Sequence, residues 1–297
     1  MKFGNKKALI LLTPLLVMAI VMAAFLSLLI PAHHALAQKY PSIVSKSNKL
    51  LANHEVELYS LVKNGRIKST KDSDGDGIID YFDDGSKNNI KKVFKIRAIK
   101  PFNDEFDLTV TIPEDRLNYY KKLDLPEIKK DSNFPYLATS QDPVLNKIVS
   151  DLGDLYLENY DNGNKYYLLH SILEVGRDIR YESDKKINAR GEYWKFPVET
   201  LASSSGDCED TTLLMAGLFK NAGFDVILVD FKTHIGLGLA LDDTLLRGAY
   251  GDNVPLDYYE YKGVKYYYLE TTNLDNYHLG EIPSEFKKVK PMLYEVK

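Results

Sequence analysis

The sequence of 297 residues contains a single cysteine, Cys208, so it cannot form an intrachain disulfide. It also lacks an excess of positive charge, because 38 lysine and arginine residues stand against 42 aspartate and glutamate residues. Nucleic acid is therefore not an expected partner, since its binding depends on a surplus of basic side chains. A folded protein of this composition must derive its stability from core packing or from a bound ion.

One long uncharged run lies near the N-terminus. Lys2, Lys6 and Lys7 precede an apolar stretch of 23 residues from Ala8 to Ile30, and small residues before Gln38 offer a cleavage site. This pattern predicts that residues 1–37 form an export signal. The run is also close to the ~20 residues that span a bilayer, so an uncleaved N-terminal membrane anchor is the alternative. Either way, we expect the protein to be extracytoplasmic, secreted or held at the membrane by this segment.

Residues 38–90 are predicted to be a polar stalk that carries an acidic loop at 72–83. The predicted ligands are five carboxylates and one backbone carbonyl at the spacing of a calcium loop: Asp72, Asp74, Asp76, Asp80 and Asp83, with the carbonyl of Ile78. The loop resembles those of the EF-hand, dockerin and thrombospondin type 3 families. Its last position is Asp rather than the bidentate Glu of the full EF-hand, which favours a structural Ca²⁺ over a sensor. Regulation of an enzyme by this calcium is the alternative.

The rest of the chain shows a mixed pattern of strands and helices. Alternating apolar residues predict a β-hairpin and connecting segment within 91–135, with a turn at 101–104. Helical periodicity predicts two helices within 143–179, followed by a loop at 181–201. A helix with one buried face follows from Cys208 to about residue 221, and strands are predicted at 224–231, 233–241 and 266–272. This order predicts an α+β domain over 136–297 with the Cys208 helix packed on an antiparallel sheet.

Cys208 is a candidate nucleophile because it stands at a predicted helix N-terminus, after the capping residue Asp207. The helix dipole there favours a thiolate, although the acidic neighbours at 209 and 210 act against it. A nucleophilic cysteine needs a base and an acceptor that orients the base. His234 and Glu270, each at the end of a predicted strand, are the candidates. His278 is a rival base in a loop-like stretch.

This part of the chain contains five short motifs: Gly206-Asp207-Cys208-Glu209-Asp210, Thr233-His234-Ile235, Leu269-Glu270-Thr271-Thr272, Tyr193-Trp194 and Pro197-Val198-Glu199-Thr200-Leu201. Together they resemble the transglutaminase-like superfamily, and in particular its exported prokaryotic branch. The resemblance implies a papain-like core and a catalytic triad of Cys208, His234 and Glu270. Two positions depart from the superfamily: Glu270 replaces the usual Asp, and Ile235 stands where many members carry an aromatic residue.

The resemblance implies acyl transfer on a peptide or carboxamide bond of a protein or peptide substrate. Hydrolysis is expected over cross-linking, because water is present at ~55 M unless an amine is bound beside the thioester at high effective molarity. The alternative is a noncatalytic, calcium-stabilised binding module at the cell surface. The sequence leaves the oligomeric state open.

Overall fold

The computed structural model describes residues 85, 87–97, 105–123, 134–160, 165–184, 193–254 and 256–296. The predicted signal or anchor at 1–37 and the predicted calcium loop at 72–83 lie outside these residues. Within the described ranges, no helix combines the length and the apolar character that a membrane span requires. The described residues mix helices with sheets, in agreement with the predicted α+β class.

The largest sheet has five antiparallel strands in the order β7-β8-β6-β5-β9. The three predicted strands are confirmed as β5 (Asp225–Asp230), β6 (Ile235–Ala240) and β8 (Val264–Leu269). The two edge strands, β7 (Tyr258–Tyr261) and β9 (Met292–Glu295), are absent from the sequence prediction. With four residues each, they are too short to show a clear alternation of buried and exposed side chains.

Strand pairing brings the beginning of β6 to the same end of the sheet as the end of β8. Leu237 in β6 pairs with Leu269 in β8, and the two strands run in opposite directions. His234 directly precedes β6, and Glu270 directly follows β8. Antiparallel register therefore places these two residues side by side.

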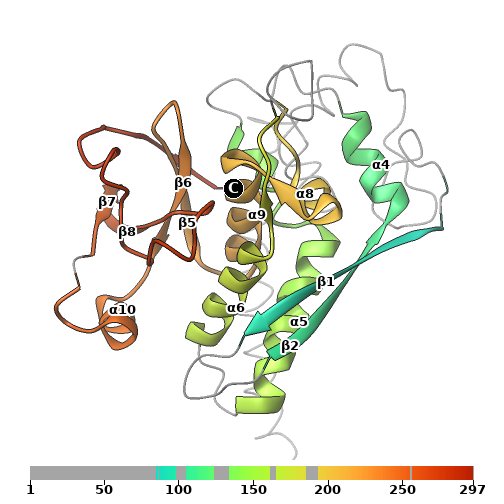
Figure 1. Cartoon of the computed structure of the whole chain (residues 1–297), viewed down its shortest axis with the longest axis horizontal. Helices are drawn as coiled ribbons and strands as arrows, with labels where there is room; N and C mark the ends of the chain where they lie inside the picture. Colours follow the sequence, from blue (N-terminus) through green and yellow to red (C-terminus); the bar gives the residue numbers. More distant parts are fainter. Residues whose placement is uncertain are drawn as a thin grey trace, which may run out of the picture. The chain divides into compact units, whose positions relative to one another are not determined.

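Helix α9 (Cys208–Asn221) lies at the centre of the described structure. It contacts β5 and β6 on one side, and α5 (Pro143–Tyr160), α6 (Lys165–Arg177) and α8 (Pro197–Ser203) on the others (Figure 1). All α9 residues from Glu209 to Phe219 are buried. The prediction of a single buried face is thus wrong, because helices enclose α9 on the sides that the sheet leaves open.

Strands β1 (Asn89–Arg97) and β2 (Glu105–Pro113) form the predicted hairpin. They pair antiparallel from Asn89 opposite Pro113 to Arg97 opposite Glu105, and the predicted turn at 101–104 lies outside the described residues. The hairpin contacts α5, α6 and α8, and its inward side chains join the same core as α9. Its interior face is therefore covered by helices.

The stretch 181–201, predicted to be a loop, contains the first five residues of the helix α8. Pro197 occupies the first helical position, and the Glu199 side chain accepts a hydrogen bond from the Phe196 N–H at 3.0 Å. A proline at the start and a glutamate in the first turn are helix-start signals that the sequence does carry. The prediction is wrong because a helix of seven residues is too short to show periodicity.

The remaining elements connect these layers. They are α4 (Glu114–Lys122), the 3₁₀ helix η1 (Phe134–Ala138), β3 (Arg180–Tyr181), β4 (Ser205–Gly206) and α10 (Asp243–Tyr250). Strands β3 and β4 form a short parallel pair, with Tyr181 opposite Gly206. This pair brings the chain after β3 to the start of α9, just before Cys208.

Candidate active site

The structure places the three predicted catalytic residues at one end of the sheet and of α9. Cys208 is the first residue of α9 and is partly buried. Burial raises the pKa of the Cys208 thiol, and the backbone N–H of Ile235, the residue after His234, acts in the opposite direction. The start of β6 is therefore next to the thiol.

His234 and Glu270 form a direct pair. The His234 Nε2 lies 2.7 Å from the Glu270 Oε2, and the side chains are 14% and 3% exposed. A carboxylate on Nε2 fixes that nitrogen as the proton-bearing one in the neutral ring. Nδ1 is then the nitrogen that can accept a proton from a nucleophile.

The Glu270 carboxylate is held by further hydrogen bonds on both oxygens. The Tyr268 hydroxyl donates to Oε2 at 3.0 Å, and the Thr272 N–H and hydroxyl donate to Oε1 at 3.0 and 2.6 Å. Burial alone raises the pKa of Glu270, but the bonds from His234 and Thr272 outweigh it and hold the pKa below its ordinary value. Glu270 is thus a fixed anionic acceptor, so the extra methylene relative to Asp is accommodated here.

The Cys208 thiol donates a hydrogen bond to a neighbour on its own helix. Its Sγ lies 3.0 Å from the Glu209 Oε2. Burial, followed by the charge and the hydrogen bond of Glu209, raises the pKa of the Cys208 thiol well above its ordinary value. The effect of the helix dipole, which favours a thiolate at this position, is therefore outweighed by burial and by the acidic neighbour.

The other acidic neighbour, Asp210, is engaged elsewhere. Its Oδ1 accepts a hydrogen bond from the Lys195 N–H at 2.7 Å, and its Oδ2 lies 2.6 Å from the Lys195 Nζ. Asp210 is fully buried, so this pair ties the loop before α8 to the first turn of α9. Its role is to hold the start of the helix in place.

A group of carboxylates that could hold a metal ion lies beside the thiol. Asp184, Asp207 and Glu209 are buried, and one ligand oxygen from each lies within 4.8 Å of the others. Burial and the charges of Asp210 and Asp184 raise the pKa of Asp207 to about 6. Burial, with the charge of Asp207, raises the pKa of Glu209 to about 8, although the bond from Cys208 acts in the opposite direction. Sequence reasoning missed this group, because Asp184 lies far from the motif in the chain.

One aromatic residue at the site also escaped the sequence analysis. The Phe286 ring stacks on the His234 imidazole at 4.9 Å between centroids, with 6° between the planes. Phe231 in turn stacks on Phe286 at 4.7 Å. Phe286 lies in a stretch without regular helix or strand, so no periodicity marks it in the sequence. The stack fixes the plane of the imidazole.

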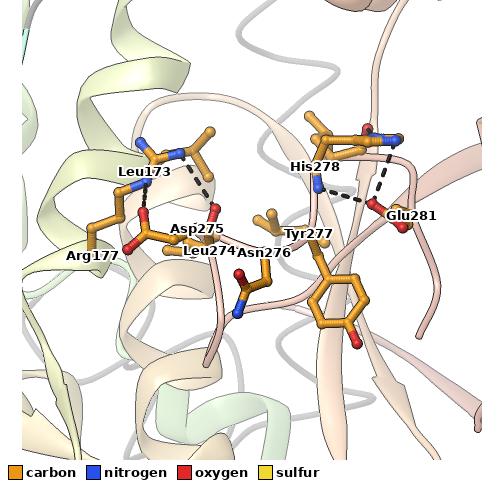
Figure 2. Close-up of a pocket in the computed structure, with 10 residues that line it drawn as sticks. Leu173, Arg177, Leu274, Asp275, Asn276, Tyr277, His278 and Glu281 are labelled. Carbon is orange, nitrogen blue, oxygen red and sulfur yellow. Dashed lines mark hydrogen bonds and ion pairs between the residues drawn. The ribbon is translucent and has the colours of Figure 1, made fainter. Parts of the chain in front are cut away.

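The rival base His278 belongs to a separate cavity. Its Nε2 lies 3.5 Å from Glu281, and both residues line a pocket of about 320 Å³ (Figure 2). On the opposite side of that pocket, Arg177 forms an ion pair with Asp275 at 3.2 Å. His278 is thus partnered by Glu281, whereas Glu270 partners His234.

Tyr193 and Trp194 contribute to packing. The Tyr193 hydroxyl donates to Glu199 at 2.8 Å, and Trp194 packs against the main core. Both residues therefore help to position α8 against α9.

Comparisons of the chain with protein-family models, with curated proteins and with solved structures found no match.

Proposed function

We propose that the protein is an extracytoplasmic cysteine enzyme of the transglutaminase-like kind that transfers acyl groups from peptide or carboxamide bonds. The observation that carries the proposal is the His234–Glu270 pair at 2.7 Å, at the sheet end that adjoins the only cysteine of the chain. Nucleophilic catalysis by cysteine requires a thiol, a base and an acceptor that orients the base, and the buried Glu270 carboxylate orients the imidazole here.

In the proposed reaction, Nδ1 of His234 takes the proton of the Cys208 thiol, and the sulfur attacks the carbonyl carbon of the substrate. Backbone N–H groups at the start of α9 stabilise the oxyanion. The leaving amine takes the proton from His234 as the C–N bond breaks, which leaves a thioester on Cys208. Water, deprotonated by His234, then attacks the thioester and releases a carboxylic acid and the free thiol. An amine in place of water gives a cross-link.

The test compares four forms of the protein: wild type, Cys208→Ala, His234→Gln and His278→Gln. Each is incubated with a complex peptide mixture, with and without a fluorescent primary amine, and products are identified by mass spectrometry. We expect cleavage or amine incorporation by wild type and by His278→Gln, the matched control, and loss of both in the other two variants. Activity that survives Cys208→Ala overturns the proposal.

A second candidate, a noncatalytic binding module, is favoured by one observation, the raised pKa of the Cys208 thiol. The rate of alkylation by iodoacetamide near pH 6, in excess Ca²⁺, separates the two candidates. An enzyme thiol reacts faster than a small model thiol under these conditions, because part of it is ionised. A rate no faster than that of the model thiol favours the binding module.

Export through residues 1–37 and a structural Ca²⁺ in the loop at 72–83 are part of the same proposal. The motifs described in the sequence support them. The mass of the protein recovered from the producing cells distinguishes a chain that begins at Gln38 from one that keeps its anchor. Chelation that lowers thermal stability without changing activity is expected for a structural calcium.

A further inference from the structure

Three carboxylates beside Cys208 come from two parts of the chain and converge in the interior. Asp184 follows β3, Asp207 precedes α9, and Glu209 lies in the first turn of α9. Their residues are 3%, 6% and 5% exposed. A carboxylate in such a position loses its hydration and needs hydrogen bonds or a positive charge in exchange.

Each of these carboxylates has one buried oxygen without a hydrogen-bond partner among the described residues: Oδ1 of Asp184, Oδ1 of Asp207 and Oε1 of Glu209. The second oxygens are engaged. The Asp184 carboxylate accepts the Tyr193 N–H, Asp207 accepts the Asp184 N–H at 3.4 Å, and Glu209 accepts the Cys208 thiol. The unpartnered oxygens therefore belong to side chains that are already held in place.

Among the described residues, no basic side chain is paired directly with the group. Within the described ranges, no lysine, arginine or histidine forms an ion pair with any of the three carboxylates. The nearby ammonium of Lys195 is bound to Asp210 at 2.6 Å. Three buried carboxyl groups with one unpartnered oxygen each point to a cation from solution.

We propose that Asp184, Asp207 and Glu209 together bind one divalent cation of the hard, oxygen-seeking kind, with Ca²⁺ as the best fit. Two oxygens that each lie about 2.4 Å from a calcium ion are at most about 4.8 Å apart, which matches the spacing of this group. Nitrogen or sulfur ligands do not join the group among the described residues, which disfavours zinc. Water completes the six to eight ligands that Ca²⁺ takes.

Glu209 serves two partners at this site, and this couples the cation to the thiol. Its Oε2 accepts a hydrogen bond from the Cys208 thiol, with 3.0 Å between Oε2 and Sγ, while its Oε1 is the unpartnered oxygen. When the Glu209 carboxylate coordinates a cation, its oxygens become weaker hydrogen-bond acceptors, so the hydrogen bond from the thiol is lost. The thiol proton is then available to His234. This consequence for catalysis rests on the proposed function, whereas the cation site itself does not.

Binding is tested by titration calorimetry with CaCl₂ on the full chain. All variants carry Asp74→Asn and Asp76→Asn, which disable the predicted calcium loop, and this double variant is the background protein. We expect about one Ca²⁺ bound per chain. Glu209→Gln and Asp184→Asn should each weaken binding at least tenfold. The matched control Glu182→Gln, a partly exposed acidic residue paired with Arg180, should leave binding unchanged. Absence of binding, or equal binding by Glu209→Gln and the control, overturns the proposal.

Thermal unfolding distinguishes a variant that has lost a Ca²⁺ ligand from a variant that fails to fold. Because Glu209→Gln removes one carboxyl group from a cluster of three buried ones, it should melt no lower than the background protein without Ca²⁺. Added Ca²⁺ should raise the midpoint of the background protein and of Glu182→Gln, but not that of Glu209→Gln. A rise of the same size in all three contradicts the assignment of Glu209 as a ligand.

The coupling to Cys208 is read from the infrared S–H stretch, which is a single band because the chain has one cysteine. We expect the band to move or to vanish when Ca²⁺ binds, and Cys208→Ala identifies it. Calcium that binds without changing the band refutes the shared role of Glu209. Since binding and the S–H band are measured without substrate, failure here is distinguishable from failure of the proposed enzymatic function.

Discussion

Replacement of Gly236 by alanine tests how tightly the back of the candidate site is packed. Gly236 is in β6, and a Cβ built there would lie 2.6 Å from the Tyr268 hydroxyl and 2.9 Å from two carbons of its ring. Tyr268 is fully buried, with Phe231 and Tyr259 packed edge-on against it at 5.9 and 6.5 Å. The ring therefore cannot turn aside without disturbing the residues around it, and its hydroxyl must move relative to Glu270.

Two effects set the expected magnitude for Gly236→Ala. Overpacking of a filled core costs about 1–3 kcal/mol, and the weakened hydrogen bond from Tyr268 to a charged group costs up to about 1.5–3 kcal/mol. We therefore expect a loss of about 3 kcal/mol in the free energy of unfolding, which lowers the thermal midpoint by about 6–12 °C in a domain of this size.

Thermal unfolding followed by circular dichroism measures the effect. The control is Gly153→Ala in α5, where a Cβ meets nothing within 4 Å, so stability should be unchanged or raised by up to about 1 kcal/mol. Tyr268→Phe removes the atom nearest the new Cβ, so the double variant should be about 1 kcal/mol more stable than the sum of the two single changes. A Gly236→Ala midpoint equal to that of wild type, or strict additivity, would refute this account of the packing.

Three further predictions concern other parts of the structure. Burial raises the pKa of Glu270, but its hydrogen bonds outweigh this effect and hold the pKa in the folded state below the ordinary value of 4.5. The ionised carboxylate therefore contributes its full stabilisation above pH 4.5, and this stabilisation is lost as the pH falls through the folded-state pKa. Urea unfolding of wild type should accordingly lose stability more steeply below about pH 4.5 than Glu270→Gln does, and parallel pH profiles would contradict the pairing. Phe286→Leu removes the stack on His234 and should cost about 1–2 kcal/mol in chemical denaturation, whereas an unchanged midpoint would mean that the stack adds nothing. Arg116→Ala should cost about 3–5 kcal/mol, because it leaves Asp142 buried without the guanidinium that lies 3.2 Å away; Arg116→Met with Asp142→Asn should recover most of this loss in the same denaturation assay.

Local patterns in the sequence predicted the elements that carry the candidate site. The helix from Cys208 follows the capping residue Asp207, and the strands after His234 and before Glu270 are short runs rich in apolar or aromatic residues. The antiparallel hairpin of β1 and β2 was predictable from its alternation of apolar and polar residues. The prediction fails for α8, β7 and β9, whose lengths of seven, four and four residues give too few repeats to recognise.

By itself, the sequence determined which side chains stand at the ends of elements: a thiol at a helix start, and an imidazole and a carboxylate at strand ends. Short-range backbone preferences and side-chain periodicity are enough to decide that. Only the tertiary structure decided what those side chains meet, namely Glu270 on His234, Phe286 on the imidazole, and Glu209 on the Cys208 thiol. It also decided that Asp184 joins Asp207 and Glu209, because the short parallel pair of β3 and β4 brings distant segments together. Register and burial depend on contacts between elements, and these contacts reverse the effect on Cys208 that its place at a helix N-terminus suggests.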